Sequence, residues 1–237
     1  MIVLALDTAT PATVVGLLRN DGEVFEARHD PAEAERPGHA TQLLGLVEMV
    51  LESGGCTLND VELIAAGTGP GSFTGLRIGI ATARALAQAQ KVPLAGIGTL
   101  RALAVGAGEG PERLVVAVLD ARRGEAFAAA YAGDRELVAP SALAPDALAA
   151  AVRRLGTAAG APPLAVGDGA LRFREHLEAA GAAIPADASP LHRVSARQLC
   201  RLAAEAEVTD RDAVLPEYVR PPDARPLQPD RKPHSAK

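Results

Sequence analysis

The sequence that decides the fold occurs twice. The first copy reads Ile2-Val3-Leu4-Ala5-Leu6-Asp7, and a second apolar stretch at 13–18 follows it. The second copy reads Leu114-Val115-Val116-Ala117-Val118-Leu119-Asp120 and is followed by a turn and by an outgoing apolar stretch at 125–131. Short apolar runs that are bounded by turn residues predict buried strands. The repeat therefore predicts two halves that each open with a strand, an aspartate, a turn and another strand.

The rest of the pattern adds helices and further strands to each half. In the first half we expect a strand at 23–27, helices at 39–53 and 76–90, and strands at 61–66 and 92–97. In the second half we expect a helix at 145–155, a strand at 164–167 and a helix at 195–206, which Ser195 and Gln198 begin with a capping box. This order predicts an α/β protein with two duplicated subdomains, each a mixed β-sheet flanked by helices, as in the actin-like ATPase fold (ASKHA, ribonuclease H-like).

The same pattern predicts the domain boundaries. Residues 1–110 form an N-terminal actin-like subdomain and residues 111–219 a smaller C-terminal one. In residues 220–237 prolines stand among charged residues, a composition that favours extended, unpacked chain. We expect this segment to be a flexible proline-rich tail.

Composition excludes several classes of function. The formal net charge is −5, aromatic residues make up 3% of the chain and tryptophan is absent, so the chain lacks both the basic surface and the stacking platforms for holding nucleic acid by itself. Cys56 and Cys200 stand far apart without CxxC spacing, and the first residues lack the basic region of a signal peptide. No apolar run reaches the roughly 18 residues of a membrane span. We expect a cytoplasmic protein that makes no membrane contact.

Two turns mark where phosphates would approach in an actin-like ATPase. Their key positions are Asp7, Thr8, Thr10 and Asp120. The first turn contains no glycine, although close approach of backbone to a phosphate favours one, and the second turn carries two bulky arginines. We interpret the four positions as a vestigial phosphate site in which the aspartates cap or polarise strand ends. No catalytic residue is predicted.

The densest glycine pattern reads Gly67-Thr68-Gly69-Pro70-Gly71-Ser72-Phe73-Thr74-Gly75-Leu76-Arg77 and leads into a helix. No lysine follows its last glycine, so it is not a Walker A loop, and it lacks the acidic residue of a dinucleotide fingerprint. The plainer interpretation is a strand-to-helix turn that Ser72 or Thr74 caps. Two sets of small residues then recur four apart: Gly79, Ala83 and Ala87, and Ala81, Ala85 and Ala89. Such smooth faces suit packing within the domain or a helix–helix interface between proteins, and periodicity favours neither.

Four segments together resemble the TsaB (YeaZ) family of tRNA threonylcarbamoyladenosine biosynthesis proteins. They are Ala5-Leu6-Asp7-Thr8-Ala9-Thr10, Gly69-Pro70-Gly71-Ser72-Phe73-Thr74-Gly75-Leu76-Arg77-Ile78-Gly79, Asp120-Ala121-Arg122-Arg123-Gly124-Glu125 and Pro216-Glu217-Tyr218-Val219-Arg220. The resemblance extends from Met1 to about Arg220 and does not cover the tail. It implies an actin-like two-domain ATPase fold that has lost its own catalysis and serves as the dimerisation and activating subunit for the transferase TsaD.

The resemblance also implies partners. The helix that begins near Gly75 and the helix at 39–53 would contact TsaD, and the same surface would pair two copies of the chain when TsaD is missing. TsaE, an ATPase, joins the pair, and tRNA is reached only indirectly. No cofactor is expected in the isolated chain, and ATP or ADP would bind only in the complex. The implied interface residues are His39, Leu43, Val47, Phe73, Thr74, Arg77, Gly79, Ile80, Ala83 and Ala87.

The same fold also allows two other functions. An active small-molecule kinase would need glycine-bearing phosphate loops and a catalytic carboxylate. A glycoprotease-like metallopeptidase would need the two histidines, four apart, that the TsaD relatives carry, and the corresponding positions here are Thr99 and Leu103. The five histidines of the chain include no pair at helical spacing, so no metal site is predicted.

Overall fold

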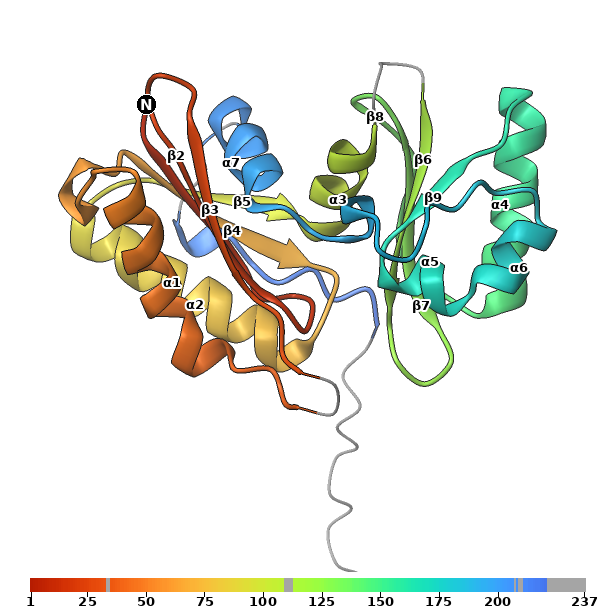
Figure 1. The fold of residues 1–237 in the computed structure, drawn as a ribbon, viewed down its shortest axis with the longest axis horizontal. Coiled ribbons are helices and arrows are strands. Elements are labelled where there is room, and N and C mark those ends of the chain that lie inside the picture. Colours follow the sequence, from red (N-terminus) through yellow and green to blue (C-terminus); the bar gives the residue numbers. More distant parts are fainter. Residues whose placement is uncertain (33–34, 109–112, 207, 209–210, 221–237) are drawn as a thin grey trace, which may run out of the picture.

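The computed structural model describes residues 1–32, 35–108, 113–206, 208 and 211–220 of the 237-residue chain. In this part of the chain two β-sheets and their helices form five alternating layers (Figure 1). The α/β fold class with duplicated mixed sheets is confirmed. No helix of the described residues is both long enough and apolar enough to cross a membrane.

The first sheet has the strand order β3-β2-β1-β4-β5. Its strands are β1 (Val3–Asp7), β2 (Thr13–Leu18), β3 (Val24–His29), β4 (Leu63–Gly69) and β5 (Leu94–Gly98). The central strand β1 pairs antiparallel with β2 and parallel with β4. Its apolar run is uninterrupted because both of its faces are buried.

The second sheet repeats this topology, with the order β8-β7-β6-β9. Its strands are β6 (Leu114–Asp120), β7 (Ala126–Ala132), β8 (Arg135–Leu143) and β9 (Leu164–Val166). Here β6 takes the place of β1, since it pairs antiparallel with β7 and parallel with β9. The predicted duplication is confirmed in strand order and direction, although β5 has no counterpart among the described residues of the second sheet.

The helices fill the layers outside and between the two sheets (Figure 1). They are α1 (His39–Ser53), α2 (Phe73–Gln90), α3 (Thr99–Ala107), α4 (Pro145–Ala159), α5 (Asp168–Arg172), α6 (Arg174–Ala179) and α7 (Ala196–Glu205), with short 3₁₀ turns η1 (Leu58–Asp60), η2 (Pro190–His192) and η3 (Arg211–Ala213). On β1, Leu4 and Leu6 face α1 and α2, whereas Val3 and Ala5 face α3 and α7 in the layer between the sheets. That central layer also receives one face of β6, so a single apolar core joins the two lobes.

The structure both matches and departs from the predicted elements. Helix α1 has the predicted bounds, and α2 begins three residues earlier than predicted because the Ser72 hydroxyl caps it, accepting a hydrogen bond from the Gly75 N–H at 3.2 Å. Helices α3, α5 and α6 and strand β8 were not predicted. Helix α7, which was expected to lie within the second subdomain, packs against β1 and β2 of the first sheet. The boundaries at 110 and 219 stay predictions, and of the tail predicted at 220–237 only Arg220 lies within the described residues.

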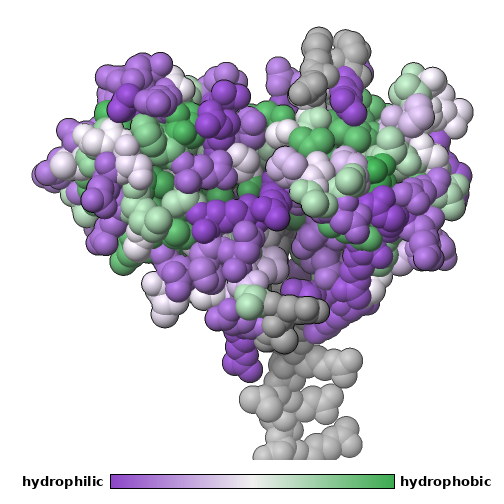
Figure 2. Space-filling model, in the orientation of Figure 1, coloured by the Kyte–Doolittle hydropathy of each residue, from purple (hydrophilic) through white to green (hydrophobic). Residues whose placement is uncertain are grey.

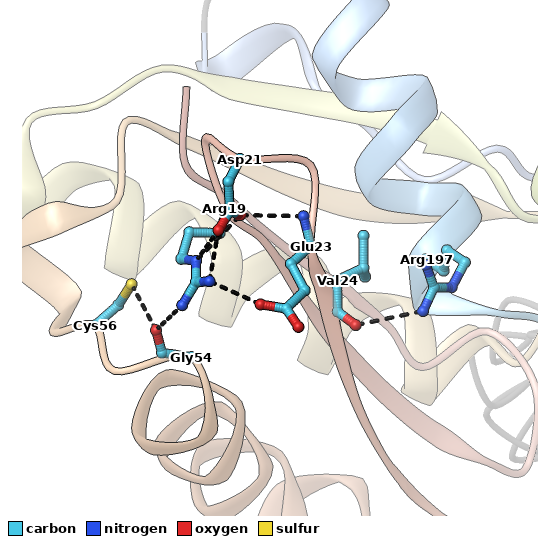
Figure 3. Close-up of polar contacts among 7 residues, drawn as sticks. All are labelled: Arg19, Asp21, Glu23, Val24, Gly54, Cys56 and Arg197. Carbon is cyan, nitrogen blue, oxygen red and sulfur yellow. Dashed lines mark hydrogen bonds and ion pairs between the residues drawn. The ribbon is translucent and has the colours of Figure 1, made fainter.

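Arginine side chains tie the first lobe together around α1 and α7 (Figure 3). Arg19, after β2, donates to the carbonyl of Gly54 at the end of α1 at 3.1 Å and forms ion pairs with Asp21 and Glu23. Arg197 of α7 reaches the carbonyl of Val24 in β3 at 3.4 Å. The Arg19 contact fixes the end of α1 near β2, and the Arg197 contact ties α7 to β3.

Candidate functional site

A cleft of about 690 Å³ lies between the two lobes. Its walls come from the β1–β2 turn, the loop before α2, the β6–β7 turn, the start of α5 and residues 217–220. Two of the predicted vestigial phosphate positions, Thr10 and Asp120, line this cleft. The other two, Asp7 and Thr8, are buried beneath it at 1% exposure each.

Asp7 is held by donors of its own chain. Its Oδ1 accepts from the Ala9 N–H at 2.7 Å and its Oδ2 accepts from the Thr99 hydroxyl at 2.7 Å. Burial raises the pKa of Asp7, and the hydrogen bonds from Ala9 and Thr99 act against that rise. Because both oxygens are engaged inside the protein, Asp7 caps the end of β1.

The glycines of the 67–79 segment allow α2 to lie directly on the β1–β2 turn. The Thr8 hydroxyl donates to the Gly75 carbonyl at 2.7 Å, and the Ser72 N–H donates to the Ala9 carbonyl at 2.7 Å. A Cβ at Gly75 or at Gly79 would overlap Thr8. The glycine pattern therefore serves a close contact between two segments of the chain.

Asp120 is paired within the second lobe. Its Oδ2 lies 2.7 Å from Nη1 of Arg172, and its Oδ1 accepts from the Arg122 N–H at 2.9 Å. Asp168, at the start of α5, accepts from the Asp120 N–H at 3.0 Å. Burial raises the pKa of Asp168, and the neighbouring charge of Asp120 raises it further. Arg122 and Arg123 in this turn have left-handed backbone conformations, with φ of 60° and 54°.

The structure divides the predicted interface residues into two groups. Phe73, Thr74 and Arg77 are exposed at the start of α2. The others are buried in the first lobe: His39, Leu43, Val47, Gly79, Ile80, Ala83 and Ala87. His39 is held by a hydrogen bond of 2.8 Å between its Nδ1 and the Thr13 hydroxyl, and burial lowers its pKa.

The prediction that Gly79, Ala83 and Ala87 face a partner is therefore wrong. Ala83 and Ala87 are 0% exposed and belong to the apolar cluster between α2 and the first sheet. Their small side chains let the helix approach the strands closely. The second set of small residues, with Ala81 and Ala85, lies on the exposed side of α2.

The outer face of α1 and α2 carries apolar side chains that the sequence reasoning missed. Leu44 and Met49 of α1 are 55% and 56% exposed. On α2, Ala81 and Ala85 are exposed, and the two helices contact each other. We call this surface the outer helical face. The sequence could have indicated this surface, because Leu44 and Met49 lie outside the apolar stripe of α1.

The chain contains no visible metal centre in the part that the structure describes. Residues 1–32, 35–108, 113–206, 208 and 211–220 include no group of three or more histidine, cysteine, aspartate or glutamate side chains that could hold a metal ion.

Comparison with known proteins places the chain first in a class and then in a family. Its fold is that of actin-like ATPases: the ROK hexokinase from Thermus thermophilus superposes with a TM-score of 0.53 at 13% identity, covering 86% of this chain and 99% of that chain. A family model described as "TsaD: tRNA N6-adenosine threonylcarbamoyltransferase" matches residues 30–165. The chain belongs to the TsaB/YeaZ family within this fold.

Two relatives illustrate the family. The Escherichia coli "tRNA threonylcarbamoyladenosine biosynthesis protein TsaB" is 43% identical over 136 residues, which are 56% of this chain and 56% of that protein. The match thus spans about half the length of this curated relative. The structure of YeaZ from Pseudomonas aeruginosa superposes with a TM-score of 0.74 at 29% identity, covering 92% of this chain and 99% of that chain.

Proposed function

We propose that this chain takes part in tRNA threonylcarbamoyladenosine biosynthesis as a non-catalytic subunit that pairs with a TsaD-type transferase and activates it. Membership of the TsaB/YeaZ family supports the role in this biosynthesis. The pairing rests on one observation, the apolar outer helical face.

The outer helical face has the composition of a contact surface. Leu44 and Met49 of α1 leave more than half of their area in water, and helix α2, which contacts α1, exposes the small residues Ala81 and Ala85. Figure 2 draws one side of the whole molecule, on which hydrophilic residues predominate and apolar residues form smaller groups. Large exposed apolar side chains favour a protein contact, and small residues on a helix let a partner helix come close. A stable interface needs about 800 Å² from each partner, which two adjacent helices can supply.

The two phosphate turns support a role without phosphoryl transfer. Asp7 is buried and bonded through both oxygens, and Asp120 is paired with Arg172. A kinase of the same fold would need one of these carboxylates free to face an acceptor, and no contact at either turn favours that function.

The remaining partners follow from this role. Two copies of the chain pair through the outer helical face when TsaD is missing, and TsaE joins the TsaD complex. The tRNA is bound through TsaD, ATP or ADP binds only in the complex, and the protein works in the cytoplasm.

The test uses a charge placed on the outer helical face. Ala81→Arg puts a guanidinium on the proposed interface, where an unpaired buried charge costs several kcal/mol and so weakens binding about 100-fold or more. The matched control is Ala158→Arg, which places the same side chain on the exposed face of α4 in the other lobe. Isothermal titration with TsaD should show the loss for Ala81→Arg alone, while both variants melt like the wild type. Undiminished binding of Ala81→Arg would show that the outer helical face is not the interface.

A further inference from the structure

The two lobes are joined through the helix between them. Helix α3 packs against β4 and β5 of the first sheet and against β6 and β7 of the second. The lobes meet in the apolar core around α3, and an attachment outside this core would further restrict their motion relative to each other. Residues 214–220 have the contacts of such an attachment.

The start of this segment is anchored in the first lobe. Val214 is 4% exposed in the core of that lobe, and its carbonyl accepts from Nη2 of Arg84 in α2 at 2.5 Å. The Glu217 N–H donates to the Thr68 carbonyl in β4 at 2.7 Å.

Tyr218 continues this anchoring on α2. Its ring lies 5.4 Å from that of Phe73, centroid to centroid, and its hydroxyl accepts from Nε of Arg77 at 3.2 Å. The guanidinium of Arg77 stacks over the Phe73 ring at 3.8 Å. These three side chains fix the segment to the first turns of α2.

Arg220 attaches the other end of the segment to the second lobe. Its Nη1 donates to the Ala121 carbonyl at 3.1 Å, and its Nη2 forms an ion pair with Glu125. The guanidinium also lies over the Phe127 ring, 5.6 Å from the centroid. All three partners belong to the β6–β7 hairpin, and residues 217–220 themselves line the cleft.

We propose that residues 214–220 form a clamp that fixes the angle between the two lobes and thereby sets the width of the cleft. The segment is bonded to the first lobe at Tyr218 and to the second at Arg220. One residue of chain extends at most about 3.3 to 3.6 Å, so the lobes can separate by only a few Å at this place while both ends stay bound. Wider opening of the cleft requires the Arg220 contacts to break. The clamp works in the isolated chain and does not depend on any partner.

Single-molecule energy transfer between the lobes tests this clamp. Dyes are attached at Glu52→Cys on α1 and Glu175→Cys on α6, both exposed, in a Cys56→Ser background. Cys200 is left in place, because burial raises the pKa of its thiol to about 12 and keeps it unreactive. Sub-nanomolar dilution excludes signals from paired copies. Arg220→Ala should broaden the transfer distribution and shift its mean, since the second lobe is released to rock about α3.

The matched control is Arg174→Ala. Arg174 also bonds a backbone carbonyl and forms carboxylate ion pairs, but its partners Glu178, Pro185 and Asp187 all lie within the second lobe. Its loss should leave the transfer distribution unchanged. A wild-type distribution for Arg220→Ala, or the same shift in Arg174→Ala, overturns the proposal. If Arg220→Ala does not fold, Arg220→Gln removes the guanidinium that pairs with Glu125 and lies over Phe127, and a wild-type distribution for that variant overturns the clamp as well.

Discussion

Replacing Thr99 by valine should destabilise the protein strongly, although the side chain keeps its shape. The Thr99 hydroxyl is buried between two partners, donating to Asp7 at 2.7 Å and accepting from the Gly69 N–H at 3.2 Å. Losing a hydrogen bond to a charged group costs about 1.5 to 3 kcal/mol, and leaving a buried N–H unpaired costs about 1 to 3 kcal/mol more. With both partners buried, the loss should be about 3 to 5 kcal/mol, which lowers the melting temperature by about 10 °C in a chain of this size.

The loss of unfolding free energy in Thr99→Val should also depend on pH. The pKa of the Asp7 carboxyl is raised in the folded protein. The stability that this carboxyl contributes is therefore fully present below its pKa in the unfolded chain and is lost as pH rises through its pKa in the folded protein. The Thr99 hydroxyl lowers that pKa, and its removal raises the pKa further. The variant should therefore lose more stability relative to the wild type at pH 7 than at about pH 4, where more of Asp7 is protonated.

Urea denaturation of both proteins at the two pH values measures these differences. Thr157→Val is the control, because the Thr157 hydroxyl is exposed and donates to the Arg153 carbonyl one turn earlier in α4, so its loss should cost less than about 0.5 kcal/mol. If the unfolding free energy of Thr99→Val in urea is within about 0.5 kcal/mol of the wild type, or if the difference is the same at both pH values, Asp7 does not depend on Thr99 as a charged group.

Three further predictions concern α2 and the cleft. Gly79→Ala should destabilise the protein by about 1 to 3 kcal/mol in urea, since the new Cβ would overlap the Thr8 hydroxyl, and a neutral result would mean that α2 can move off the β1–β2 turn. Ala83→Arg should fail to give soluble folded protein, whereas Ala85→Arg on the exposed side should melt normally; a well-folded Ala83→Arg would contradict the assigned face of the helix. The purified chain should hydrolyse ATP no faster than background, and a turnover that persists through repurification and disappears in Asp7→Asn would refute the structural role of that aspartate.

Much of the fold could be predicted because its central strands are buried on both faces. The runs at 2–6 and 114–119 are apolar throughout, and the repeat of run, aspartate and turn predicts the duplicated topology. Strand β8 was missed because it is an exposed edge strand that contains Pro140 and lacks regular alternation. Helix α3 was missed because it has nine residues, is buried on most sides and has Gly98 as its N-cap, which offers no side chain to cap it.

The candidate site was only partly predictable. The first phosphate turn lacks a glycine and the second carries two bulky arginines, which indicated that both turns are altered. The structure gives Asp7 and Asp120 partners within the chain. The sequence could not predict which side of α2 is buried, because both sides carry small residues at the same spacing. The contact of α2 with the first sheet decides between them, burying Ala83 and exposing Ala81.

The central claim is tested most directly by the threonylcarbamoyl-transfer rate of purified TsaD when this chain is added. TsaD is supplied with threonylcarbamoyl-adenylate, TsaE and tRNA, and the modified adenosine is quantified as wild-type chain or Ala81→Arg is titrated in. The account predicts that wild-type chain raises the rate until it is equimolar with TsaD, that Ala81→Arg raises it only at much higher concentration, and that the chain without TsaD forms no product. Product formed by the chain without TsaD, or a TsaD rate that does not respond to the wild-type chain, would contradict the account.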